Sequence, residues 1–242
     1  MSSPLVDGRL ELPHLGRRVA LWENVLPVLR HAILSGRLAA GTRLQPEKLA
    51  RELGVSRGPV TEALRRLHEE NLVTFAPNGR PFVRGLTHGY VRDFYAFRSS
   101  LDLQACKFAL ARSPQLDLGE LRAALNLMWA LQAAGDMGGL TDVDMRFHRQ
   151  LIALAHNAVL DRVWANIADF SLSLLTVTDS LLNGARTVAA VHAAIVEALG
   201  ARDLVAVEEA IATHYRLGEE LLVASELVQP DDEPGDGPAP RT

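Results

Sequence analysis

Four residues with metal-binding side chains stand on the apolar faces of predicted helices: Asp144, His148, His192 and His214. Asp144 and His148 are four residues apart, which places them on one face of a helix. Leucine and phenylalanine residues share these faces, so the faces are expected to point into the protein interior. A buried carboxylate and buried imidazoles are unfavourable unless they are paired or bind a metal. One divalent cation would satisfy all four side chains, and the pattern therefore predicts a metal site.

Each of these residues also has a simpler interpretation. A single histidine on an apolar face is commonly a core side chain that hydrogen-bonds to a backbone carbonyl. A carboxylate four residues before a histidine can form an ion pair or cap on the helix surface. The joint occurrence of all four residues on inward faces favours the metal site. Three imidazoles and one carboxylate suit Zn²⁺, which we expect first, and also Ni²⁺, Mn²⁺ or Co²⁺.

Arg98 is a further candidate, because its guanidinium lies in an apolar stripe with Phe94 and Leu101. Two interpretations are open. Arg98 can pair with Asp102, four residues further on, or it can bind an anionic ligand through its planar fork of donors.

The elements that position these residues follow from hydrophobic periodicity. From residue 87 onward the spacing of apolar residues is that of helices throughout. The predicted helices are 87–112, 116–134, 139–156, 158–183, 185–200 and 202–227. The predicted breaks between them are Pro114, Gly135, Asn157, Gly184 and Gly200.

The first part of the chain predicts a different architecture. Helices are expected over 21–35, 46–53 and 57–71, with Pro46 opening the second, Gly54 ending it and Ser56 capping the third. Strands are expected over 72–75 and 81–84, with a turn between them. Two short helices followed by a hairpin predict a winged helix-turn-helix. The N-terminal turn of its second helix, with Ser56 and Arg57, would meet phosphates and base edges of DNA. A helix-turn-helix that contacts only protein is the alternative.

Charge is divided unevenly along the chain. The net charge is −4, but residues 1–86 hold 13 Lys and Arg against 8 Asp and Glu, while the remainder holds 12 against 21. This gives +5 for the first part and −9 for the second, so only the first part is expected to meet a polyanion.

No apolar run is long enough to span a membrane, and the N-terminus lacks an apolar signal core. With a single cysteine, Cys106, the chain is expected to be cytoplasmic.

Several segments of the first part resemble the DNA-binding domain of the GntR family of bacterial transcription regulators. They include Ala32-Ile-Leu-Ser-Gly-Arg-Leu38, Leu53-Gly-Val-Ser-Arg57 and Asn71-Leu-Val73. The helical part resembles the FadR-type effector domain of that family, the FCD domain. The resemblance implies an antiparallel bundle of six or seven helices around a ligand cavity. Cavities of this type commonly bind organic acids.

The resemblance also bears on single residues. Metal-binding members use an Asp-x-x-x-His pair and two later histidines, which Asp144, His148, His192 and His214 match one by one. Asn157 also fits the pattern, and together with Arg98 it is predicted to contact the ligand. The sequence differs from the family pattern at three positions of the DNA-binding part. Family members often have Arg where this chain has Thr61, Thr where it has Gly58 and a basic residue where it has Glu47. The predicted DNA-binding residues are Lys48, Ser56, Arg57, Gly58, Thr61, Gly79 and Arg80.

The predicted fold is therefore mainly α, with an N-terminal winged helix-turn-helix over 20–86 and a C-terminal all-α antiparallel helical bundle over 87–227. Residues 1–19 are expected to be flexible and 228–242 disordered. We predict a transcription regulator, not an enzyme, that binds a palindromic double-stranded DNA operator as a homodimer and responds to a small organic acid at the metal. A metal-dependent hydrolase-like enzyme and a regulator with a purely structural metal are the alternatives.

Overall fold

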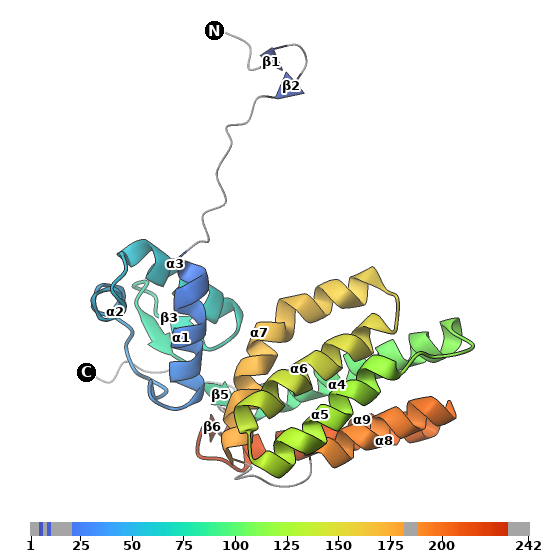
Figure 1. The fold of residues 1–242 in the computed structure, drawn as a ribbon. Coiled ribbons are helices and arrows are strands. Elements are labelled where there is room, and N and C mark those ends of the chain that lie inside the picture. The colour runs from blue at the N-terminus through green and yellow to red at the C-terminus, as the bar shows by residue number, and fades with distance from the viewer. Residues whose placement is uncertain (1–4, 7–8, 11–20, 182–187, 232–242) are drawn as a thin grey trace.

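The computed structural model describes residues 5–6, 9–10, 21–181 and 188–231, and within these ranges the chain is mainly helical (Figure 1). The N-terminal part consists of helices α1 (Trp22–Leu34), α2 (Pro46–Leu53) and α3 (Arg57–Glu69) and strands β3 (Val73–Phe75) and β4 (Pro81–Val83). The C-terminal part consists of helices α4 (His88–Arg112), α5 (Gly119–Ala134), α6 (Met137–Ala153), α7 (Ala158–Leu181), α8 (Val188–Ala201) and α9 (Leu204–Val223). The predicted fold class is confirmed.

The turn between α2 and α3 forms for the reasons that the sequence indicates. Pro46 is the first residue of α2, where its missing N–H costs no helical hydrogen bond. Gly54 ends the helix at φ 66°, a left-handed conformation that glycine adopts without a steric penalty. Ser56 is extended and begins α3, but its side chain makes no capping hydrogen bond. The hydroxyl of Ser56 therefore lies at the exposed start of the predicted recognition helix.

The wing is a short antiparallel hairpin. β3 and β4 pair with Val73 opposite Val83 and Phe75 opposite Pro81. Both valines are buried, so the hairpin is anchored to the helices by one face. Gly79, at φ 74°, closes the turn at its exposed tip.

Side-chain caps begin several helices of the C-terminal part. Thr87 accepts from Tyr90 at the start of α4, Asp136 accepts from Gly139 at the start of α6, and Asp203 accepts from Val205 and Ala206 at the start of α9. Several predicted ends are corrected: α5 begins at Gly119 rather than at 116, α6 ends at Ala153 rather than at 156, α8 continues through Gly200 to Ala201, and α9 ends at Val223 rather than at 227. Gly184 lies outside the residues that the structure describes.

The helical part has a core of its own. α5, α6, α8 and α9 contribute fully buried apolar side chains to it, among them Met128, Phe147, Ile195 and Ile211. This apolar shell surrounds the polar residues of the candidate site. It keeps water away from them and so strengthens every electrostatic interaction among them.

A second core is shared by the two parts of the chain. Leu29 of α1 and Leu64 of α3 belong to the same apolar cluster as Phe170 and Leu174 of α7 and Leu222 of α9. α1 packs directly against α7, as Figure 1 shows. The helix-turn-helix is therefore joined to the helical bundle by buried apolar surface as well as by the chain.

A pair of short strands closes the junction between the two parts. β5 (Leu86–Thr87) pairs in parallel with β6 (Val228–Gln229), and Val228 is buried. The Asp231 carboxylate accepts hydrogen bonds from the backbone N–H of Gly89 at 2.6 Å and from Arg92 at 3.0 Å. The prediction of disorder is therefore wrong for residues 228–231. Residues 232–242 lie outside the described ranges.

Near the N-terminus, strand β1 (Leu5–Val6) pairs antiparallel with β2 (Arg9–Leu10) inside the segment predicted to be flexible. The remaining residues of 1–20 lie outside the described ranges. None of the helices in the described part of the chain is long and apolar enough to cross a membrane.

Candidate metal centre and nucleic-acid interface

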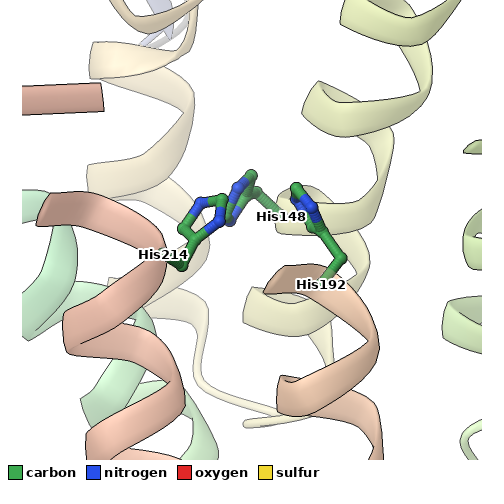
Figure 2. A group of neighbouring side chains, drawn as sticks. All are labelled: His148, His192 and His214. Carbon is green, nitrogen blue, oxygen red and sulfur yellow. The ribbon is translucent and has the colours of Figure 1, made fainter. Parts of the chain in front are cut away.

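Three imidazoles converge inside the helical bundle. His148 comes from α6, His192 from α8 and His214 from α9, and their rings point toward one another in Figure 2. One nitrogen of each ring lies within 4.8 Å of the other two. The ring centroids of His192 and His214 are 4.5 Å apart, and those of His148 and His214 are 4.9 Å apart. Small side-chain rotations would bring all three nitrogens onto one ion.

Asp144 lies beside this cluster, one helical turn before His148 on α6. Its Oδ1 is 2.8 Å from Nε2 of His192, and its Oδ2 is 3.6 Å from Nε2 of His148. Asp144 is buried, as are His148 and His192. The structure thus brings together all four residues that the sequence predicts as metal ligands.

Hydrogen bonds orient two of the imidazoles. Nδ1 of His192 donates to the carbonyl of Val188 at 2.8 Å, and Nδ1 of His148 donates to Oδ2 of Asp102 at 2.6 Å. In both rings this leaves Nε2 facing the centre of the cluster. Nδ1 of His214 is buried without a hydrogen-bond partner, and Nε2 of His192 makes only its ion-pair contact with Asp144. Unsatisfied buried nitrogens are costly, and a metal ion would satisfy them.

The protonation states of Asp144 and His214 suit metal binding, whereas a metal would have to displace a proton from His192. Burial together with the charges of His192 and His148 places the pKa of His214 well below its ordinary value, so this ring is neutral. Burial opposes the ionised form of Asp144, but the neighbouring His192 and His148 outweigh it and lower the pKa of the carboxyl group. Burial would likewise lower the pKa of His192, but the contact with Asp144 raises it. An ionised carboxylate and a neutral imidazole are the forms that bind a metal.

These residues fit a divalent transition metal. Three imidazole nitrogens and one carboxylate oxygen are donors that Zn²⁺, Ni²⁺, Mn²⁺ and Co²⁺ accept, and a site with four protein ligands keeps one or two positions open in five- or six-coordinate geometry. The geometry therefore accommodates both a metal and a further ligand.

A cavity of about 80 Å³ adjoins the cluster. His148, His192, His214 and Asp144 line it, and so does Arg98. The volume is well below the roughly 300–1,000 Å³ typical of pockets for drug-sized ligands. A ligand that enters without rearrangement of the helices is accordingly small.

Arg98 contacts Tyr215 and Trp164, and it reaches Asp102 only indirectly. Its Nη2 donates to the hydroxyl of Tyr215 at 3.0 Å, and its guanidinium stacks 4.4 Å from the ring centroid of Trp164. It reaches Asp102 through the Tyr215 hydroxyl, which donates to Oδ2 of Asp102 at 2.5 Å. Nε of Arg98 is buried and has no hydrogen-bond partner. This donor is therefore suited to an anion in the cavity.

Asn157 is placed away from the cavity. Its side-chain oxygen accepts from the backbone N–H groups of Val159 and Leu160, so it caps the start of α7. It is not among the residues that line the cavity. Its predicted contact with a ligand has no support from this geometry.

Sequence reasoning missed two residues of the site, Asp102 and Tyr215. Asp102 was considered only as a partner of Arg98, whereas it contacts His148, which is 46 residues away. Tyr215 directly follows His214, but nothing in the spacing indicates that its hydroxyl lies between Arg98 and Asp102. A buried carboxylate beside the apolar Leu101 and Ala105 was the one available signal.

The residues predicted to contact DNA lie on the exposed edge of α2, α3 and the wing. Arg57 is exposed and forms an ion pair with Glu47 at 3.1 Å. Lys48 is exposed and lies 3.9 Å from Glu52. Gly58 and Thr61 are exposed on the first turns of α3, and Gly79 and Arg80 are exposed at the tip of the wing. The sequence did not reveal this ion pair between Arg57 and Glu47.

Comparison with known families decides the class of protein. The family model described as "Bacterial regulatory proteins, gntR family" matches residues 21–83, and the one described as "FCD domain" matches residues 93–217. The chain belongs to the GntR family. The resemblance inferred from the sequence is confirmed. As a GntR regulator with an FCD domain, the protein is a DNA-binding, effector-responsive transcription regulator.

Individual GntR-family relatives agree. The HTH-type transcriptional regulator McbR of Escherichia coli is 28% identical over 158 residues, which are 62% of this chain and 70% of McbR. The solved structure of McbR matches with a TM-score of 0.62 and 26% identity, over 85% of this chain and 98% of that one. The probable D-xylose utilization operon transcriptional repressor of Paenarthrobacter nicotinovorans is 29% identical over 185 residues, 75% of this chain and 80% of that protein. The gluconate operon transcriptional repressor of Bacillus subtilis is 28% identical over 143 residues, 57% of each chain.

Proposed function

We propose that this GntR-family regulator binds a palindromic operator as a homodimer and that a small carboxylate changes this binding. The carboxylate would coordinate a divalent metal ion held by Asp144, His148, His192 and His214. The observation that carries the proposal is the cavity that both this cluster and Arg98 line.

The chemistry favours an acid over a neutral ligand. A bound metal would supply a Lewis-acidic centre with a position open to a carboxylate oxygen. Arg98 supplies a second anion contact, because its Nε is buried and lacks a partner. Its guanidinium is held in place by Tyr215 and Trp164, so little side-chain entropy is lost when an anion binds. Gluconate, in the printed name of one relative, is itself a small carboxylate.

A physical route leads from the site to the helix-turn-helix. α9 carries His214 and Tyr215 and then continues to Leu222, which lies in the core that both parts of the chain share. Beyond α9, β6 pairs with β5 immediately before α4, the helix that carries Arg98. A shift of α9 on ligand binding would move the surface on which the helix-turn-helix rests. A coupling of about 1–3 kcal/mol is enough to change operator occupancy roughly five- to 150-fold.

Opposite changes in DNA affinity are expected from substitutions of the ion pair at the start of α3. Arg57→Ala should weaken operator binding by about 1–3 kcal/mol and relax specificity at one base pair of each half-site, because a bidentate contact to guanine is lost. Glu47→Gln should strengthen binding about two- to fivefold, because an exposed ion pair worth up to about 1 kcal/mol no longer competes with DNA for Arg57. Fluorescence anisotropy with operator and mutated-operator duplexes measures both effects.

Glu23→Gln is the matched control for Glu47→Gln, because Glu23 is also an exposed carboxylate of the N-terminal part but belongs to α1, which carries none of the residues predicted to contact DNA. It changes the net charge equally. If Glu23→Gln strengthens binding as much as Glu47→Gln does, the effect is only one of net charge. An Arg57→Ala loss that is the same for every DNA sequence would mean that Arg57 contacts phosphate and reads no base.

The effector proposal is tested on the full chain loaded with Zn²⁺. Small carboxylic acids are expected to raise the melting temperature and to change the anisotropy titration with a palindromic duplex, whereas their methyl esters do neither. Light scattering is expected to give twice the 26.4 kDa of one chain. Arg98→Met should lose the response to acids and Arg98→Lys should retain part of it, because only the lysine keeps a cation in the cavity. If only neutral compounds change the melting temperature or DNA binding, or if no acid changes either in the Zn²⁺-loaded protein, a purely structural metal is the better interpretation.

A further inference from the structure

We infer that Asp102 is a positioning residue of the metal centre, because it orients the imidazole of His148. Tyr215 and Arg98 in turn hold Asp102 in place. The inference rests on the proposed metal site and extends it to residues that do not touch the ion. No direct contact of Asp102 with the metal is involved.

The two nitrogens of His148 face two different carboxylates. Nε2 faces the cluster, where Asp144 lies 3.6 Å away. Nδ1 faces away from the cluster and lies 2.6 Å from Oδ2 of Asp102. A carboxylate accepts hydrogen bonds, so the Asp102 contact puts the proton on Nδ1 and leaves the lone pair of Nε2 for a metal. Such a partner also fixes the plane of the ring and makes the imidazole a stronger donor.

Asp102 is completely buried, where a carboxylate is costly unless it is paired. Its Oδ1 has no hydrogen-bond partner, so the pairing rests on Oδ2. His148 and Tyr215 both donate to its Oδ2, at 2.6 and 2.5 Å. Arg98 donates in turn to the Tyr215 hydroxyl at 3.0 Å. The chain Arg98–Tyr215–Asp102–His148 therefore runs from the anion-binding side of the cavity to a metal ligand.

Helix geometry explains why these residues meet. Arg98 and Asp102 are one turn apart on α4 and share its buried face. α4 packs against both α6 and α9, the helices that carry His148 and Tyr215. Gly218, one turn after Tyr215, allows α9 to approach α4 closely, since a β-carbon there would lie 2.8 Å from the ring of Tyr95. The chain of hydrogen bonds thus depends on close packing of α4 and α9.

The decisive comparison is between the wild type and Asp102→Asn, titrated with Zn²⁺ and with Co²⁺ against a chromophoric chelator. Loss of an outer partner of a metal-bound histidine typically lowers metal affinity about 10- to 100-fold, and we expect a loss in that range. Asp93→Asn, which removes an exposed carboxylate from the same helix, is the matched control and should bind as the wild type does. Tyr215→Phe should lose about two- to tenfold, because Asp102 keeps His148 but loses its second donor.

A spectroscopic readout separates positioning from general stability. Long-range ¹H–¹⁵N correlation spectra of the metal-free protein should show the His148 proton on Nδ1 in the wild type and a redistribution toward Nε2 in Asp102→Asn. The absorption bands of bound Co²⁺ should shift in Asp102→Asn and stay unchanged in Asp93→Asn. If Asp102→Asn does not fold, the metal affinity and the Co²⁺ bands of Tyr215→Phe carry the test, and wild-type values for both would overturn the inference.

The outcomes are distinct. If the wild type binds metal and Asp102→Asn binds it with equal affinity and an equal Co²⁺ spectrum, this inference is overturned and the proposed function stands. If the wild type binds neither Zn²⁺ nor Co²⁺, the proposed metal-dependent function is overturned and this inference with it.

Discussion

Removal of the bound metal is expected to lower the melting temperature by about 5–10 °C. A ligand present at 100 times its dissociation constant stabilises the folded state by about 2.7 kcal/mol, and each kcal/mol corresponds to roughly 2–4 °C in a chain of this size. The cause lies in the cluster itself: without a metal, Nδ1 of His214 remains buried without a hydrogen-bond partner, and Nε2 of His192 has only the Asp144 carboxylate. Scanning calorimetry with a chelator, followed by re-addition of Zn²⁺, measures the effect.

Single substitutions identify the ligands. His192→Ala is expected to reduce bound metal, measured by elemental analysis, from one per chain to a small fraction. His156→Asn is the matched control, because His156 is exposed just beyond α6 and its positive φ of 45° is one that asparagine accepts. A melting temperature that responds to neither chelator nor Zn²⁺, together with no metal in the purified protein, would contradict the metal site.

Phe170→Ala is expected to destabilise the whole protein by about 3–5 kcal/mol, because a large buried aromatic side chain leaves a cavity. Phe170 of α7 packs edge-to-face with Phe94 at 4.8 Å and with Tyr90 at 6.0 Å between ring centroids. It belongs to the core that contains the buried side chains of α1 and α3. The helix-turn-helix and the bundle should therefore unfold together, at a melting temperature lower by on the order of 10 °C.

Val159→Ala is the control for this experiment, since Val159 is also on α7 but 71% exposed, and its replacement should change stability by less than about 0.5 kcal/mol. Hydrogen exchange of α1 and α3 reports on the helix-turn-helix separately. Unchanged protection there in Phe170→Ala, with loss of protection only in the bundle, would show that the shared core does not couple the two parts.

The sequence predicted the helices well because the relevant signals are local. Apolar spacing, Pro46 and Gly54 determine α2 and the turn after it without any distant contact. Asp144 and His148 could be placed on one face for the same reason. His192 and His214 required an assumption, that three inward faces meet, and the structure satisfies it.

Features that depend on distant contacts were not predictable in this way. β6 is only two residues long, next to a tail rich in proline and acidic residues, and it pairs with β5, more than 140 residues earlier in the chain. The roles of Asp102 and Tyr215 arise where α4, α6 and α9 meet. Asn157 shows the opposite case, because a residue that fits a family pattern has its side chain occupied by a local helix cap.

The pairing of β5 with β6 brings the two ends of the bundle to one place. The chain enters the bundle at Leu86 and leaves it beside that point at Val228, and the two strands are hydrogen-bonded. α4, which carries Arg98, begins directly after β5, and α9, which carries His214, ends shortly before β6. The two helices therefore share one anchor point, directly after the helix-turn-helix, and a change in their spacing would act on the chain there.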